Sequence, residues 1–185
     1  MRHVFYTRIP GSMKDGNIKL RPVRIIDGPF LSNGLKDKDM LAATGLSCPI
    51  SSSWFSVWWW LKKNFVLSYC IENNSKRIGF IGLYNLLFGN SAEMTLIIFA
   101  KDNRRLGLGT RAFNVFAQNL RRYSIARKIK VRVKTDNGIA LSFWENNGFE
   151  EICTQDDVKI MCADLNHGCP SNLGKRIEGP YYNKN

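Results

Sequence analysis

The part of the sequence best suited to bind a ligand is a glycine-containing loop, residues 104–110, which reads Arg-Arg-Leu-Gly-Leu-Gly-Thr. The residues before it, 92–99, are apolar and β-prone enough to predict a buried strand. Those after it, 110–122, place large apolar side chains on one helical stripe. Glycines let a backbone approach a ligand closely, and the first amides of a helix have no internal partners. This order of strand, loop and helix therefore predicts a site for a phosphate or another anion.

Three kinds of phosphate-binding loop have glycines at similar spacing, and the neighbouring residues separate them. A Walker loop requires a Lys-Ser/Thr pair after its last glycine, which this loop lacks. The dinucleotide-binding fingerprint requires an acid about 20 residues further on, where residues 128–134 are only basic and apolar. The third pattern, Arg/Gln-x-x-Gly-x-Gly/Ala, is satisfied by Arg104, Gly107 and Gly109. In this pattern the chain resembles the pyrophosphate loop of the GNAT superfamily of acetyl-CoA-dependent N-acetyltransferases.

A second stretch, which begins at Asn137, also resembles this family. It is similar to the signature Asn-x-x-Ala-x-x-Leu-Tyr-x-x-x-Gly-Phe at Asn137, Ala140, Phe143, Gly148 and Phe149. The residues alone predict a helix with an Asn N-cap and an Asn-Gly end, followed by a strand. The tyrosine of the signature is replaced by Trp144. The resemblance covers residues 18–165 and is nearest to the branch that acts on protein N-termini and amino-sugar nucleotides.

The resemblance implies that acetyl-CoA is the co-substrate. In the family, the strand before the loop carries a bulge and diverges from its neighbour, and the pantetheine arm inserts into the gap. Residues 97–99 would offer backbone groups to the arm, and the amides of residues 105–110 would hold the pyrophosphate, with added charge from Arg104 and Arg105. The implied cofactor-binding residues are Ile97, Ile98, Phe99, Arg104, Arg105, Leu106, Gly107, Leu108, Gly109, Thr110, Asn137 and Trp144.

Acetyl transfer to an amine requires a base, because an alkylammonium with a pKa near 10 must lose a proton before it attacks. His3 and His167 lie in the two tails of the chain. Glu93 is the candidate base, since many family members carry a glutamate on this strand. The alternative roles for Glu93 are structural: an ion pair with a neighbouring arginine, or the capping of a loop.

The departing thiolate of coenzyme A either takes up a proton or leaves without one. The usual donor in the family is the tyrosine of the second signature, and the indole N–H of Trp144 cannot replace it. A hydroxyl such as Tyr84 or Ser142, a water molecule, or unaided departure remain open, since a thiol has a pKa near 8.5. A protein that binds acetyl-CoA without catalysis is a further alternative.

The net charge of +12 is concentrated in one region. Residues 101–134 contain 11 lysines and arginines and a single acid, Asp102. Part of this charge suits coenzyme A, which carries a pyrophosphate and a 3′-phosphate. The remainder favours an anionic amine acceptor, small molecule or peptide, over polyamines and aminoglycosides. A basic nucleic-acid-binding protein is the competing class, and we expect it less.

Composition and cysteine content predict a cytoplasmic protein. No apolar run approaches the roughly 20 residues of a membrane span, and the N-terminus lacks the apolar region of a signal peptide. The five cysteines form no CxxC pair, which indicates buried free thiols in a reducing compartment. Cys162, His167 and Cys169 are close in sequence, but without a fourth ligand they do not predict a zinc site, and no metal is expected.

Hydrophobic periodicity predicts the elements that position these residues. Strands are expected at 18–24, 65–72, 77–84, 92–99, 129–133 and 158–163, another strand from Phe149, and helices after Asp27, over 110–122 and after Thr135. With the resemblance, this gives an α+β GNAT fold: a mixed, mostly antiparallel sheet of six to seven strands, splayed centrally and flanked by helices.

The expected domain, residues 18–165, lies between a loose N-terminal arm, 1–17, and an irregular C-terminal tail, 166–185. The aromatic segment Trp54–Trp60 is expected to pack internally or in a homodimer, or else to border the acceptor pocket.

Overall fold

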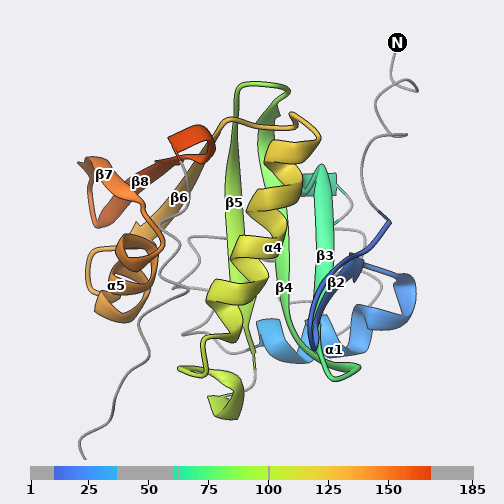
Figure 1. The fold of residues 1–185 in the computed structure, drawn as a ribbon. Helices are drawn as coiled ribbons and strands as arrows, with labels where there is room; N and C mark the ends of the chain where they lie inside the picture. Colours follow the sequence, from blue (N-terminus) through green and yellow to red (C-terminus); the bar gives the residue numbers. More distant parts are fainter. Residues whose placement is uncertain (1–10, 37–60, 62, 100, 168–185) are drawn as a thin grey trace, which may run out of the picture.

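The computed structural model describes residues 11–36, 61, 63–99 and 101–167 (Figure 1). The aromatic segment 54–60 lies outside the described residues. The strands are β1 (Met13–Asp15), β2 (Ile18–Pro22), β3 (Leu67–Asn73), β4 (Lys76–Leu87), β5 (Ser91–Ile98), β6 (Lys128–Lys134), β7 (Glu150–Gln155) and β8 (Val158–Asp164). The helices include α1 (Gly28–Leu35), α4 (Leu108–Arg122) and α5 (Gly138–Asn146), and 3-10 turns occur at Ile25–Asp27, Lys101–Asn103 and Leu165–His167.

The strands form one sheet in the order β1-β2-β3-β4-β5-β6-β8-β7. Every neighbouring pair is antiparallel except β5 and β6, which are parallel. The mixed, mostly antiparallel α+β sheet of the GNAT fold is therefore confirmed. The described residues form eight strands, rather than the six or seven expected. The additional strand is β1, which pairs with β2 from within the segment expected to be a loose arm.

The parallel pair β5–β6 is short and opens into a gap. The two strands pair at only three positions, from Ser91–Lys128 to Glu93–Lys130. Beyond Glu93, β5 continues along β4 while β6 continues along β8, so the two strands diverge (Figure 1). The central splay predicted by the family resemblance is therefore present, and it begins at Glu93.

The carbonyl of Asn90 sets where this pair starts. It accepts hydrogen bonds from the backbone N–H groups of Arg127 at 2.8 Å and Lys128 at 2.9 Å. The turn between β4 and β5 is thereby joined to the beginning of β6. This contact fixes which residues of β5 and β6 lie opposite each other.

The two faces of the sheet are covered by different helices. On one face, α4 buries Phe113, Phe116 and Leu120 on its apolar stripe and crosses the middle of the sheet (Figure 1). On the other face, Leu31 of α1 packs in a second cluster with Phe80. Because side chains alternate along a strand, successive residues of β5 belong to different faces. None of the helices in the described part of the chain has the length and apolarity needed to cross a membrane.

Two glycines of β4 allow close approach of neighbouring chain segments. A Cβ atom on Gly79 would lie 2.1 Å from the carbonyl oxygen of Ile97, and one on Gly82 would lie 2.6 Å from the ring of Phe65. Any larger residue at these positions would push β5 or Phe65 away from the sheet.

Candidate active site

The gap leaves one backbone edge of β5 facing away from β4. The N–H of Phe99 donates to the carbonyl of Ile78 at 2.9 Å, so these two residues form a hydrogen-bonded pair. Such pairs alternate with non-hydrogen-bonded pairs in antiparallel strands, so the backbone groups of Leu96 and Ile98 point into the gap. Of residues 97–99, only Ile98 therefore has the orientation expected towards a pantetheine arm. The backbone N–H groups of Ile97 and Phe99 point towards β4, and Leu96 was not predicted. Cofactor binding by residues 97–99 stays a prediction.

The bulge that the family resemblance placed on β5 lies on β4 instead. Between the pairs Tyr84–Glu93 and Leu87–Ser91, β4 contains two residues and β5 one. Asn85, in this bulge, has a left-handed φ of 47°. Its Nδ2 donates to Oε1 of Glu93 at 3.0 Å. The extra residue therefore directs an amide onto the candidate base.

Tyr84 lies directly opposite Glu93, on the sheet face covered by α1. Burial, and then the charge of Glu93, raises the pKa of Tyr84 to about 12. A thiol has a pKa near 8.5, so proton transfer from Tyr84 to a thiolate would be uphill by about 5 kcal/mol. The hydroxyl is therefore suited to donate a hydrogen bond and poorly suited to give up its proton. Ser142, the other hydroxyl considered, lies exposed on α5.

Arg104 fastens the glycine loop to the end of β5. Its Nε donates to the carbonyl of Ile98 at 3.1 Å, and its Nη2 donates to that of Phe99 at 3.1 Å. The side chain expected to add charge at the pyrophosphate thus also fixes the loop relative to the gap.

The beginning of α4 has the geometry of an anion site. Gly107 is the N-cap, with a left-handed φ of 71°, and Arg105 has a φ of 61°. The N–H of Arg111 donates to the carbonyl of Gly107 at 3.0 Å as the first bond of the helix. The amides of residues 108–110 therefore lack acceptors within the helix and point from its positive end. A helix start of this kind can bind an anion, and binding of the pyrophosphate by this loop stays a prediction.

Gly109 lies where α4, α5 and β5 meet. A Cβ atom there would lie 3.2 Å from the ring of Phe143 and 3.7 Å from the side chain of Leu96. Neither side chain was predicted to take part in the site, although Phe143 belongs to the second signature. Leu106, in the same loop, is 65% exposed. Residues two apart on a strand direct their backbone groups to the same edge, so Leu96 faces the gap if Ile98 does. This alternation could have indicated Leu96 from the sequence.

The two residues implied by the second signature have structural roles. The Oδ1 of Asn137 accepts from the N–H of Ala140 at 3.1 Å and caps α5. Trp144 is 6% exposed. Its ring packs against Phe113 and Phe149, with centroid distances of 5.9 Å and 4.8 Å. Trp144 therefore joins the core between α4 and α5, and a cofactor contact by either residue stays a prediction.

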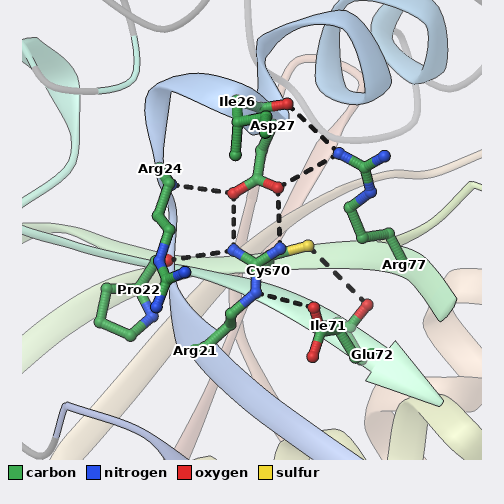
Figure 2. Close-up of polar contacts among 9 residues, drawn as sticks. All are labelled: Arg21, Pro22, Arg24, Ile26, Asp27, Cys70, Ile71, Glu72 and Arg77. Carbon is green, nitrogen blue, oxygen red and sulfur yellow. Dashed lines mark hydrogen bonds and ion pairs between the residues drawn. The ribbon is translucent and has the colours of Figure 1, made fainter. Parts of the chain in front are cut away.

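A buried ion-pair cluster holds the start of α1 on the sheet (Figure 2). The fully buried carboxylate of Asp27 accepts from Nη1 and Nη2 of Arg21 at 2.7 and 2.8 Å. It also accepts from the N–H of Arg24 at 2.9 Å and from Arg77 at 3.4 Å. Nε of Arg21 donates to Glu72 at 2.7 Å. Burial acts to raise the pKa of Asp27, but the hydrogen bonds and the charge of Arg21 outweigh it and lower the pKa.

Helix α1 connects this cluster to the end of β5. The ring of Phe30 packs edge-on against Phe99 at 5.2 Å, and the guanidinium of Arg77 lies 5.3 Å above the ring of Phe30. A Cβ atom on Gly34 would lie 2.4 Å from the ring of Phe99. Phe99, whose carbonyl accepts a hydrogen bond from Arg104, is therefore also packed against α1 through its side chain.

Solved structures with this fold include acetyltransferases in complex with CoA. Spermidine N-acetyltransferase from Vibrio cholerae, with CoA and spermine, has a TM-score of 0.70 at 20% identity, covering 82% of this chain and 98% of that chain. RimJ from Mycobacterium smegmatis, with CoA-disulfide, has a TM-score of 0.70 at 17% identity, covering 86% and 90%. RimL, a ribosomal L7/L12 α-N-protein acetyltransferase in complex with CoA, has a TM-score of 0.71 at 15% identity, covering 84% and 97%.

Sequence comparison identifies the family. A search of the curated proteins found no match. The sequence model of the Acetyltransferase (GNAT) family matches residues 39–149, more than half of the chain. The matched segment contains the gap, the glycine loop and the second signature. This chain thus belongs to the GNAT family of acetyltransferases, acyltransferases whose co-substrate is acetyl-CoA.

Proposed function

We propose that the protein transfers acetyl directly from acetyl-CoA to a primary amine, with Glu93 as the general base and no covalent enzyme intermediate. The observation that carries this proposal is that the pairing of β5 with β6 ends at Glu93. The gap thus begins at the candidate base and opens towards the anion-binding start of α4. From Glu93 to Ile98 it extends about 16 Å at 3.3 Å per residue, which suits an extended pantetheine arm.

The chain's own groups fit the parts of acetyl-CoA, which supplies an activated thioester carbonyl. The backbone N–H groups at Leu96 and Ile98 would bind the arm and the carbonyl oxygen, a role that needs no side chain. The amides of residues 105–110 would bind the pyrophosphate, and Arg105 would add an exposed positive charge.

Glu93 would accept the proton of the amine before attack. Asn85 donates to its Oε1, and the carboxylate keeps further lone pairs to accept that proton. The high pKa of Tyr84 supports a hydrogen-bonding role beside Glu93, so the thiolate would leave unaided or take a proton from water. Trp144 would have no part in this step.

We further propose that the acceptor is an anionic amine, such as a nucleotide-linked amino sugar, or a protein N-terminus. The relatives above differ here, since one structure contains spermine and another protein acetylates the ribosomal protein L7/L12. A net charge of +12 opposes polyamines and favours anions. A cytoplasmic location is consistent with the free thiols of Cys70, Cys153 and Cys162.

Calorimetry with acetyl-CoA and a thiol-release assay test this function. Wild-type protein should bind acetyl-CoA with a dissociation constant in the micromolar range or below. Glu93→Gln should retain this affinity and lose about 10²- to 10⁴-fold in turnover, most at low pH, where little of the amine is already neutral. Glu145→Gln, an exposed carboxylate on α5, is the control.

Two outcomes would contradict this function. Unchanged turnover in Glu93→Gln would remove Glu93 from the mechanism. Absence of acetyl-CoA binding, together with DNA binding that falls steeply with salt, would favour the nucleic-acid alternative.

A further inference from the structure

A row of polar side chains crosses four strands on the face that carries Glu93. Glu93 lies opposite Lys130 on β6, Lys130 lies opposite Cys162 on β8, and Cys162 lies opposite Glu150 on β7. Residues opposite each other in a sheet point to the same face, and Ile129, between Lys128 and Lys130, is buried on the α4 side. The row therefore runs outward from the candidate base on the face opposite α4.

A groove of about 870 Å³ lies over the part of this row on β6, β8 and β7 and over the neighbouring pair Lys128–Asp164. Its charged lining consists of two lysines, Lys128 and Lys130, and three acids, Glu150, Glu151 and Asp164, of which Glu151 is paired with Lys159. Glu93 is not in the lining, but Lys130 lies one strand from it, about 4.8 Å in the hydrogen-bonding direction. The groove thus begins one strand away from the candidate base.

The order of charges along the groove favours an anionic ligand next to the amine. Counting from Glu93, the first charged residue is Lys130, and Glu150 follows only two strands later. Asp164, beside Lys128, already accepts from the N–H of Asn166 at 2.8 Å. A polyamine with one nitrogen at Glu93 would bring its next ammonium towards Lys130.

The two groove lysines also differ from the other lysines of this half of the sheet. Lys134 pairs with Asp157 at 3.4 Å, and Lys159 pairs with Glu151 at 2.7 Å. Lys128 and Lys130 make no ion pair with any residue that the structure describes. Their ammonium groups are therefore available to a ligand.

We propose that this groove binds the acceptor and selects amines that carry a carboxylate or phosphate close to the nitrogen, with Lys130 as the specificity-determining residue. This inference rests on the proposed acetyl transfer and extends it to the chemistry of the acceptor. Lys130 binds the anionic group nearest the amine, and Lys128 binds groups further along the acceptor.

Paired acceptors test the selection and identify its source. Aspartyl and asparaginyl tripeptide amides differ by one carboxylate, glucosamine 6-phosphate and glucosamine differ by one phosphate, and spermidine represents cations. Wild type should prefer the anionic member of at least one pair by about tenfold or more in kcat/KM, the size of a charge-assisted hydrogen bond. The pair that shows the preference distinguishes a carboxylate from a phosphate.

Substitutions assign the preference to Lys130. Lys130→Gln should lower kcat/KM about tenfold more for the anionic member of the pair than for the neutral member, and so abolish the preference. Lys130→Glu should raise the turnover of spermidine relative to wild type. Lys134→Gln removes the same charge from the same strand, about 13 Å further along, and should change neither ratio.

The outcomes separate this inference from the underlying function. Equal loss for both members of a pair in Lys130→Gln, no wild-type preference, or an effect of Lys134→Gln as large as that of Lys130→Gln would overturn the inference. So would acetyl-CoA binding with no anionic amine acetylated. Acetyl transfer itself fails only when acetyl-CoA does not bind or when no amine of the panel, neutral and cationic ones included, is acetylated.

Discussion

The sheet face that carries Glu93 has a closed half and an open half. Over β2, β3 and β4, α1 covers it, and Cys70 and Asp27 are both 0% exposed. Over β6, β8 and β7, Lys128 is exposed, as is every residue of β7. Both halves contain charges, but those of the closed half bind one another inside the protein. The comparison shows that the charges on this face bind one another where α1 covers it, whereas in the open half some are paired at the surface, as in Lys134–Asp157, and Lys128 and Lys130 have no ion-pair partner among the described residues.

The largest expected difference between the halves is thiol reactivity. Burial, followed by the charge of Asp27, raises the pKa of Cys70 to about 12, whereas Cys153 on β7 is exposed, contrary to the expectation of a buried thiol. Because the thiolate is the reactive form, iodoacetamide at pH 8 should modify Cys153 more than about a thousandfold faster than Cys70. Mass spectrometry of the labelled peptides measures both rates. Rapid labelling of Cys70 in the folded protein would show that α1 opens readily.

Removal of the central carboxylate should disrupt the closed half. Asp27→Ala leaves Arg21 and Arg77 without their shared partner, and loss of one member of a buried pair costs about 3–5 kcal/mol of unfolding free energy. Urea denaturation followed by fluorescence measures it. A loss below about 1 kcal/mol would mean that the cluster contributes no more than a surface pair.

The same carboxylate predicts a pH dependence. Because the pKa of Asp27 is lowered in the folded state, its contribution is present above its unfolded value, near 3.9, and is lost as the pH falls through the folded value. The stability difference between wild type and Asp27→Ala should therefore be constant from about pH 5 to 7 and shrink below about pH 4. A difference that grows towards low pH would contradict the assigned charge state.

Arg104 lies at the gap between the two halves, and its substitution should affect cofactor binding more than turnover. Arg104→Ala removes two charge-assisted hydrogen bonds, to Ile98 and Phe99, that fix the loop at the gap. We expect the dissociation constant for acetyl-CoA to rise by about tenfold, with a smaller change in kcat. Arg122→Ala, an exposed arginine at the other end of α4, is the matched control. Equal effects of the two substitutions would assign the result to overall charge.

The smallest effect is expected for a pair in the open half. Asp157→Asn removes the partner of Lys134 in a pair whose side chains are 67% and 35% exposed. The unfolding free energy should change by less than about 1 kcal/mol, and less still at high salt. The same urea titration measures this change. The loss of unfolding free energy in Asp157→Asn, in the open half, can therefore be compared directly with the loss in Asp27→Ala, in the closed half.

The sequence predicted the elements whose signals are local. The apolar run of β5, the glycine loop and the stripe of α4 lie within about 30 consecutive residues, and their order was enough to predict an anion site. β1 was missed because three residues, Met13–Asp15, are too few to show a period. Its strand conformation depends on pairing with β2, which a local pattern cannot reveal.

The parts of the site that were missed or misplaced depend on alignment between strands. A bulge is defined by counting residues on both partners, so the sequence of β5 alone could not show that the extra residue is on β4. The Arg21–Asp27–Glu72 cluster joins residues up to 51 positions apart. Lys130 became a candidate only once the register placed it opposite Glu93. Trp144 illustrates the reverse case, since the sequence placed it in the signature but could not show that its ring packs against Phe113 and Phe149.

The backbone carbonyl of Asn90 determines the charge that stands next to the candidate base. By receiving the amides of Arg127 and Lys128 it sets which residue of β6 stands beside Glu93. A shift of β6 by one residue against Asn90 would bring Ile129 or Val131 opposite Glu93 and turn the lysines to the other face of the sheet. One backbone contact thus controls the side of the site proposed for the acceptor, and it lies outside the segments proposed to hold the acetyl donor.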